Sequence, residues 1–147
     1  MLDPLRPGDD RLARMIVETP AQPKKRGHSM PEGRIQAECY QYFWNTYPKY
    51  RGLYFAVPNE NTRSDSNFIT GAQRKAMGVY HGVSDTIMLI PRGRYHGLCI
   101  EYKDEHGRQS QFQVAWQAQV EAQGYKYCLC RSLAQFKEII EEYLKQR

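Results

Sequence analysis

The chain has 147 residues, 41% of them hydrophobic, a length that suits one domain with a single buried core and is short for two. Its formal charge of +5 favours a polyanionic partner, although a similar excess also occurs on surfaces that bind nothing specific. There is no secretion-signal pattern and no apolar run near the roughly 20 residues that cross a bilayer. We therefore expect a cytoplasmic protein, in a bacterial cell or a phage-infected host, with no membrane contact.

The cysteines favour the same compartment. Their positions, Cys39, Cys99, Cys128 and Cys130, lack the paired spacing of a structural zinc site. Three of them fall in runs that read as strands. We expect buried, reduced thiols.

Residues 1–28 differ in composition from the rest of the chain. They mix proline, glycine and charge, and their apolar patch supports only a short helix over 9–18. We predict a flexible arm there, followed by one domain over 29–147. The basic triplet at 24–26 suits either a phosphate contact or a solvated tail.

The domain is predicted to start with a helix over 29–47. Ser29, Pro31 and Glu32 form a helix-start pattern, with a capping hydroxyl, a proline in the first turn and a glutamate three residues after the serine. Apolar residues recur at three- and four-residue steps until Pro48 stops the helix. An aromatic-rich run over 53–57 predicts a strand, and the polar stretch 60–67 predicts a loop.

The remaining elements follow from similar patterns. We predict a short helix over 68–77, stopped by Gly78. Two apolar runs, 86–90 and 98–103, are joined by a turn over 91–94 and predict a hairpin. The turn 104–108, a helix over 110–123, a strand over 125–130 and a closing helix over 132–145 complete an α/β domain in which helices flank a sheet of about four strands.

Three charged residues of the hairpin form a candidate catalytic site. Glu101 and Lys103 are two residues apart, so they share one face of a strand that is otherwise apolar, where charge is costly unless it is paired or binds metal. If antiparallel pairing brings Asp85 opposite Glu101, two carboxylates can share Mg²⁺ or Mn²⁺, which prefer oxygen ligands. A lysine beside them offsets the charge of a phosphodiester transition state. The alternative is an exposed edge strand with an ion pair.

With its surrounding motifs, this constellation resembles the VRR-NUC nucleases of the PD-(D/E)XK superfamily over roughly residues 31–144. The resemblance implies a restriction-endonuclease-like core with a central mixed sheet. Ser84 stands where the superfamily has a proline. The matching motifs are Glu32 and Gln36 in the first helix, residues 55–59, 78–79, 82–85, 97–103 and 107–108, and Gln113 to Trp116.

The resemblance also assigns roles. It implies that Asp85 and Glu101 bind the metal and that Lys103 orients or activates the attacking water. Gln113 would steady the site from the following helix, and Glu32 would be a further acidic member and metal ligand. Other interpretations stay open: Glu32 as a capping residue, and Gln113 and Gln36 as ordinary polar positions on helices.

Basic and polar residues offer contacts to a DNA backbone, which position a substrate without reading its sequence. Most surface arginines are only solvated charge, and His81 and His96 read as turn histidines. The candidates are Asn59, Arg51, Arg63, Arg74 and Lys75, with Arg92, Arg94 and Arg108 as further possibilities.

The leading hypothesis is a Mg²⁺- or Mn²⁺-dependent DNA endonuclease that is selective for branched duplexes. Small members of the family resemble Holliday-junction resolvases of recombination and repair, many of them from phages, and act as homodimers on two-fold symmetric junctions. One alternative is a DNA-binding module that keeps the fold without the chemistry. Another is a restriction-like nuclease that reads sequence, which would need base-reading elements that we do not find.

Overall fold

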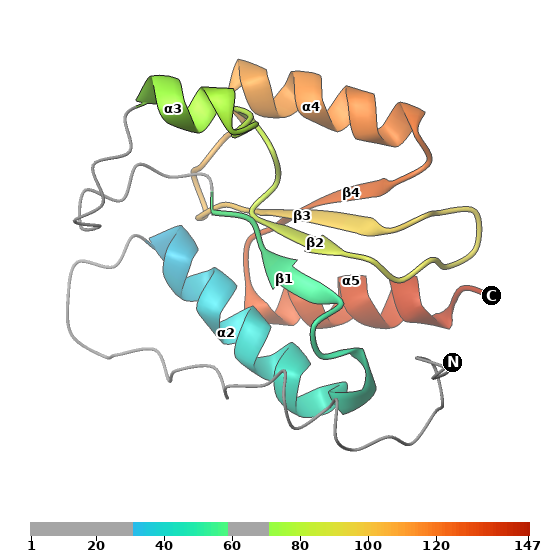
Figure 1. The fold of residues 1–147 in the computed structure, drawn as a ribbon. Coiled ribbons are helices and arrows are strands. Elements are labelled where there is room, and N and C mark those ends of the chain that lie inside the picture. Colours follow the sequence, from blue (N-terminus) through green and yellow to red (C-terminus); the bar gives the residue numbers. More distant parts are fainter. Residues whose placement is uncertain (1–30, 59–70) are drawn as a thin grey trace, which may run out of the picture.

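A computed structural model describes residues 31–58 and 71–147 (Figure 1). The predicted arm over 1–28, the capping residue Ser29, and the DNA-contact candidates Asn59 and Arg63 lie outside the described residues. In chain order the elements are α2 (Pro31–Thr46), the 3-10 helix η1 (Pro48–Tyr50), β1 (Tyr54–Ala56), α3 (Gly71–Ala76), β2 (Thr86–Met88), β3 (Leu98–Tyr102), α4 (Gln111–Ala122), β4 (Lys126–Cys130) and α5 (Leu133–Lys145).

The strands form one mixed sheet in the order β1-β2-β3-β4. The pairs β1–β2 and β2–β3 are antiparallel, whereas β3–β4 is parallel and is connected through α4. The predicted hairpin is thus confirmed, with its tip closed by reciprocal backbone hydrogen bonds between Arg92 and Tyr95. The sequence predicts every one of these strands and α-helices, and each of them lies within its predicted range.

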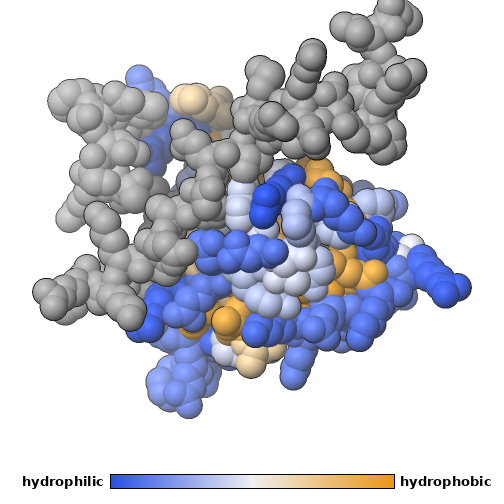
Figure 2. All heavy atoms as spheres, turned by 90° about the horizontal axis from the view of Figure 1, so that it is seen from below, coloured by the Kyte–Doolittle hydropathy of each residue, from blue (hydrophilic) through white to orange (hydrophobic). Residues whose placement is uncertain are grey.

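Helices cover both faces of the sheet. In Figure 1, α3 and α4 lie on one side of the strands, and α2 and α5 lie on the other. Viewed from the α2 and α5 side, the described surface is mostly hydrophilic, with hydrophobic residues showing in small areas (Figure 2). In the described part of the chain, no helix is both long and apolar enough to span a membrane.

The core lies between the sheet and the pair α2 and α5. Cys39 and Phe43 of α2 and Phe136 and Ile140 of α5 are buried against the strands, because their three- and four-residue spacing forms one apolar stripe on each helix. Tyr102 of β3 enters the same core, where its hydroxyl hydrogen-bonds that of Tyr54 from β1. Every residue of β3 is buried, as expected for a central strand covered on both faces.

All four cysteines are free thiols, and Cys39, Cys99 and Cys130 are buried. Burial raises the pKa of Cys99 to about 11, so its thiol stays protonated and unreactive near neutral pH. The expectation of buried, reduced cysteines is therefore confirmed for these three, and Cys128 is half-buried.

Candidate active site

Two adjacent strands bring Asp85 and Glu101 together. Asp85 immediately precedes β2, and the antiparallel register pairs Thr86 with Ile100, so the next position along each strand places Asp85 beside Glu101. Asp85 is held by the sheet itself: its Oδ2 accepts a hydrogen bond from the backbone N–H of Tyr102 (2.7 Å), and its backbone carbonyl accepts one from Val57 (2.8 Å). The predicted juxtaposition of the two carboxylates is present in the fold.

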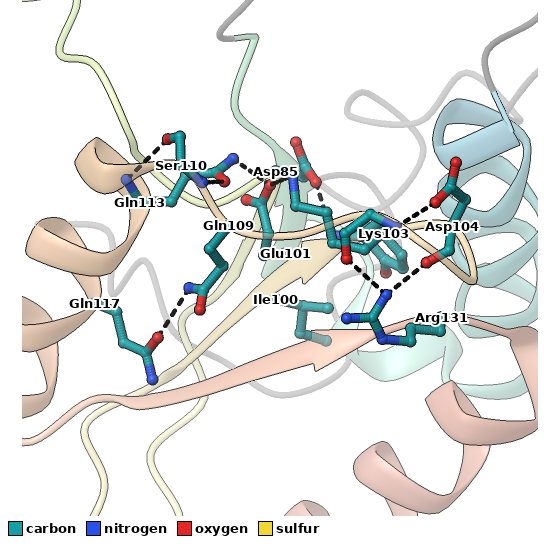
Figure 3. Close-up of polar contacts among 12 residues, drawn as sticks. Asp85, Ile100, Glu101, Lys103, Asp104, Gln109, Ser110, Gln113, Gln117 and Arg131 are labelled. Atoms are coloured by element: carbon teal, nitrogen blue, oxygen red, sulfur yellow. Dashed lines mark hydrogen bonds and ion pairs between the residues drawn. The ribbon is translucent and has the colours of Figure 1, made fainter.

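Glu101 is almost completely removed from solvent, with 1% of its surface exposed. Its Oε1 accepts hydrogen bonds from Gln113 Nε2 (2.5 Å) and from Lys103 Nζ (3.1 Å) (Figure 3). Its Oε2 is also buried, yet has no hydrogen-bond partner among the described residues. A buried carboxylate oxygen without a donor is costly and is the type of atom that a hard cation satisfies.

The pKa of Glu101 agrees with the burial of its carboxylate. Desolvation, and after it the negative charge of Asp85, raise the pKa of Glu101 to about 7, while Lys103 opposes the shift through a hydrogen bond and its charge. Lys103 follows β3 and shares the buried face of Glu101, with only 8% of its own surface exposed. An edge strand with a solvated ion pair, the alternative that the sequence left open, is therefore excluded.

Gln113 has two structural connections at the start of α4. Its backbone N–H donates to Ser110 Oγ (3.2 Å), and its side-chain Oε1 accepts from the Ser110 backbone N–H (2.8 Å), which completes a capping box. The same amide uses its Nε2 to donate to Glu101. The cap thus fixes the direction in which the amide points, so Gln113 is not an ordinary surface glutamine.

Glu32 approaches from the first turn of α2. A methyl group added at Gly107 would lie 2.9 Å from Glu32 Oε1, 3.0 Å from Asp104 Oδ1 and 3.2 Å from Lys103 Cδ. The absence of a side chain at Gly107 therefore makes room for the Glu32 carboxylate beside the turn that follows Lys103. Glu32 also lines the same cavity as the three central residues.

The turn after Lys103 is fixed by residues that the sequence did not single out. Asp104 Oδ1 accepts from the backbone N–H groups of His106 (3.0 Å) and Gly107 (2.5 Å). Arg131, just after β4, donates through Nη1 to the carbonyls of Asp104 (2.5 Å) and Gly107 (2.9 Å) (Figure 3). The Asp104 contacts lie within the turn itself, whereas the Arg131 contacts join segments distant in sequence, which no local motif indicates.

All five predicted catalytic residues border one cavity of about 240 Å³. The segment before Asp85 reaches it through Gly82, which has φ +86° and packs directly against the backbone of Phe112, so that a Cβ there would collide with the Phe112 carbonyl. The lining residues are Glu32, His81, Gly82, Val83, Asp85, Glu101, Lys103, Ser110, Phe112 and Gln113. His81 and Phe112 were not predicted as members of the site; His81 lies in a turn, as predicted, and also lines this cavity.

The residues predicted to contact DNA lie in two different parts of the structure. Arg74 and Lys75 lie on α3, on the same side of the sheet as α4 (Figure 1). Arg51 lies beyond the opposite end of α2 from Glu32, where its Nε donates to the Trp44 carbonyl (2.9 Å) and its guanidinium stacks 4.7 Å from the Trp44 ring centroid. Its structural role is to pack against α2, and it does not join the cavity.

The residues present fit a divalent cation held mainly by two carboxylates. Across residues 31–58 and 71–147, no group of three His, Cys, Asp or Glu side chains is close enough together to hold a metal ion. Asp85 and Glu101 are nevertheless neighbours, and Glu101 Oε2 is buried without a donor. Oxygen ligands of this kind match Mg²⁺ and Mn²⁺, which commonly keep water or substrate oxygens as their remaining ligands.

Together, the mixed sheet flanked by helices and the charged cavity at one end of its two central strands define an α/β protein with a nuclease-type fold. The family model of the VRR-NUC domain matches residues 32–134, and the chain belongs to that family. A solved structure described as a VRR_NUC domain protein is similar, with 26% identity, a TM-score of 0.62, and coverage of 78% of this chain and 88% of that one.

A second solved structure, described as a VRR_NUC domain, supports the fold alone. Its identity is 22% and its TM-score 0.50, with coverage of 78% of this chain and 99% of that chain. No curated protein matches the sequence. The family resemblance inferred from the motifs is therefore confirmed by the family model and by the fold.

Proposed function

We propose that this chain is a Mg²⁺- or Mn²⁺-dependent endonuclease that hydrolyses phosphodiester bonds in DNA. Membership of a nuclease-type family supports hydrolysis of nucleic acid in general. The observation that carries the proposal is Glu101, a buried carboxylate with one oxygen lacking a donor, placed beside Asp85 and Lys103 in one cavity. This arrangement costs stability in the metal-free protein, and binding of a cation would offset the cost.

Asp85 and Glu101 would hold the metal, and Glu32, on the border of the same cavity, would contact it through a water molecule. A bound cation would supply Lewis acidity toward the phosphate and lower the pKa of a bound water. The charge of the carboxylate pair suits such a cation, and the Tyr102 backbone bond keeps Asp85 in place before the cation binds.

Lys103 would orient the attacking water and offset the negative charge that develops on the phosphate. Its ammonium lies 3.1 Å from Glu101 Oε1, so one carboxylate oxygen positions the lysine while the other stays available. Gln113 would keep the two oxygens of Glu101 in these separate roles. Its Nε2 donates to the same Oε1 as Lys103 and leaves Oε2 without a donor. The amide thereby positions Glu101 without touching the substrate.

The substrate we propose is branched duplex DNA, and the enzyme we propose is a cytoplasmic homodimer. The net charge of +5 favours a polyanion. A four-way junction has two-fold symmetry, and a symmetric pair of small single-domain subunits would present two equivalent sites to it. Arg74 and Lys75 on α3, together with Asn59 and Arg63, are the proposed contacts to the DNA backbone, whereas the packing of Arg51 on Trp44 makes it the weakest of the predicted set.

A cleavage assay tests the chemistry. Wild type and Lys103→Ala are incubated with four-way, flap and linear DNA, with Mg²⁺, with Mn²⁺ and with EDTA. We expect cutting only with metal and wild-type protein, while Lys103→Ala still binds DNA. Lys137→Ala is the matched control, because Lys137 stacks on Tyr42 on the other side of the sheet. Faster cutting of linear duplex than of branched DNA would reject the branched-substrate proposal.

Calorimetric titration with Mn²⁺ tests the metal site separately. We expect binding to wild type and at least a tenfold weaker affinity in Asp85→Ala, because one of two carboxylates is lost. Equal Mn²⁺ binding by wild type and Asp85→Ala, or none by either, would favour a DNA-binding module that has kept the fold without the chemistry.

A further inference from the structure

A second cavity adjoins the candidate active site. It has a volume of about 390 Å³ and lies between α4 and the segment that runs from the end of α3 to His81. Residues spaced along α4 at helical steps, Phe112, Ala115, Trp116 and Gln119, form one wall. Lys75, Gly78, Val79, Tyr80 and His81 form the other.

The cavity is aromatic and open to solvent. Tyr80 is 60% exposed and Phe112 is 66% exposed. Trp116 is half-buried, and its ring packs against Tyr127 with 6.2 Å between centroids, which fixes the base of the wall. Exposed aromatic rings that line one cavity indicate a binding surface more often than scattered single apolar residues do.

This surface is continuous with the catalytic cavity. His81 and Phe112 line both cavities, and their rings are 5.9 Å apart, tilted by 42°. A ligand chain that occupies the catalytic cavity can therefore extend past these two rings into the aromatic one. The aromatic cavity therefore lies directly beside the catalytic cavity.

We propose that the aromatic cavity binds an unpaired nucleobase of the DNA strand whose phosphate enters the catalytic cavity. The inference rests on the proposed function, and it specifies the substrate class further. Bases stack on aromatic side chains whatever their identity, which suits a wall made of Tyr80, Phe112 and Trp116. Lys75 supplies a cation for a neighbouring phosphate, and none of the described residues that line this cavity is acidic.

The chemistry favours a base over a second protein chain. Charged residues are depleted at the centre of a protein interface, whereas Lys75 lines this mostly apolar cavity beside His81 and Gln119, which can meet a phosphate and the polar edge of a base. A base paired within a duplex cannot leave its stack without cost, so the cavity selects DNA that already carries unpaired nucleotides at the cleavage point, such as a flap or an opened junction.

The test measures binding in EDTA, so that it does not depend on cleavage. The probe is a duplex with an unpaired tail that contains a fluorescent purine analogue, compared with a blunt duplex of the same length. We expect quenching on binding by wild type. Tyr80→Ala should weaken affinity for the tailed DNA about tenfold and change affinity for blunt duplex by less than twofold, while Tyr80→Phe keeps wild-type affinity.

Val114→Ala is the matched control. Val114 is 54% exposed on the same helix but does not line the cavity, so its affinity for both DNAs should stay at the wild-type value. Equal affinities of wild type and Tyr80→Ala for the tailed DNA would overturn the proposal, as would absence of quenching in the wild type. Sedimentation of the same variants measures their oligomeric state. If Tyr80→Ala converts a dimer into a monomer without altering binding to the tailed DNA, the surface is a protein interface and the proposal is wrong.

The two proposals fail in different ways. Retained quenching with no cleavage under any metal condition would contradict the nuclease function and leave the stacking surface intact. Metal-dependent cleavage that is equal on blunt and tailed DNA, with no quenching, would contradict the stacking surface alone.

Discussion

Replacement of Glu101 by glutamine is expected to stabilise the metal-free protein above neutral pH. The glutamine is isosteric, and its amide oxygen can take the place of Oε1, where it accepts from Gln113 and Lys103. What disappears is the buried negative charge. The pKa of Glu101 rises from 4.5 to about 7 in the folded protein, chiefly through desolvation and then through Asp85.

The direction of the effect follows from proton linkage. The folded state holds this proton more tightly than the unfolded state does, so the contribution to stability is fully present below pH 4.5 and is lost as the pH rises through about 7. At about 1.4 kcal/mol for each tenfold change in proton affinity, the wild type loses roughly 3 kcal/mol across that window. Glu101→Gln does not lose this stability, because glutamine has no carboxyl group that ionises.

Urea denaturation in EDTA at several pH values measures the difference between the two proteins. We expect a difference near zero at pH 4 that grows to roughly 3 kcal/mol in favour of Glu101→Gln at pH 8. Because the comparison is between variants, the titration of carboxyl groups that do not interact with Glu101 cancels. Glu105→Gln, in the exposed turn after β3, is the control and should show no such growth. A difference between wild type and Glu101→Gln that is independent of pH would refute the reasoning.

Three further predictions concern the supports of the site. In an Asp85→Asn background, the gain from Glu101→Gln at pH 8 should shrink, since the Asp85 charge is the second cause of the pKa shift; a double-mutant cycle by urea denaturation measures it. Gly82→Ala should cost roughly 2–4 kcal/mol, because a positive φ and a collision with the Phe112 backbone add together; a loss under about 0.5 kcal/mol would contradict the close approach. Gln113→Ala should cost about 1 kcal/mol through the lost cap and slow cleavage about tenfold or more, whereas Gln117→Ala, one turn later, should leave the cleavage rate unchanged.

Much of the fold follows from local patterns in the sequence. The apolar stripe of α5, the cap at Ser110 and the alternation around Glu101 and Lys103 each depend on residues close together in the chain. Pairing of β2 with β3 then places Asp85 beside Glu101, because a short connection between apolar runs permits few other registers. The three central residues were therefore predictable before any coordinates.

The surroundings of those residues were less predictable, for a physical reason. Arg131 reaches the carbonyls of Asp104 and Gly107 across 27 and 24 residues, and side-chain to backbone bonds of this kind leave no trace in sequence spacing. The dual use of Gln113, as cap and as donor to Glu101, depends on how α4 packs over β3. Tyr80 and Phe112 lie on segments that β2 and β3 separate along the chain, so the cavity that they line is visible only in the tertiary structure.

The two carboxylates of the site relate to the fold in opposite ways. Asp85 accepts the Tyr102 backbone N–H at the point where the β2–β3 pairing ends, so its side chain continues the hydrogen bonding of the sheet. Glu101 brings a buried charge into a central strand whose other side chains, Ile100 and Tyr102 among them, are packed in the core. The free-energy cost of the site therefore comes mainly from burying the charge of Glu101. Asp85, in contrast, is held by a backbone hydrogen bond at the end of the sheet. A cation bound between them would act mainly on Glu101, and for that reason metal should raise the stability of the wild type far more than that of Glu101→Gln.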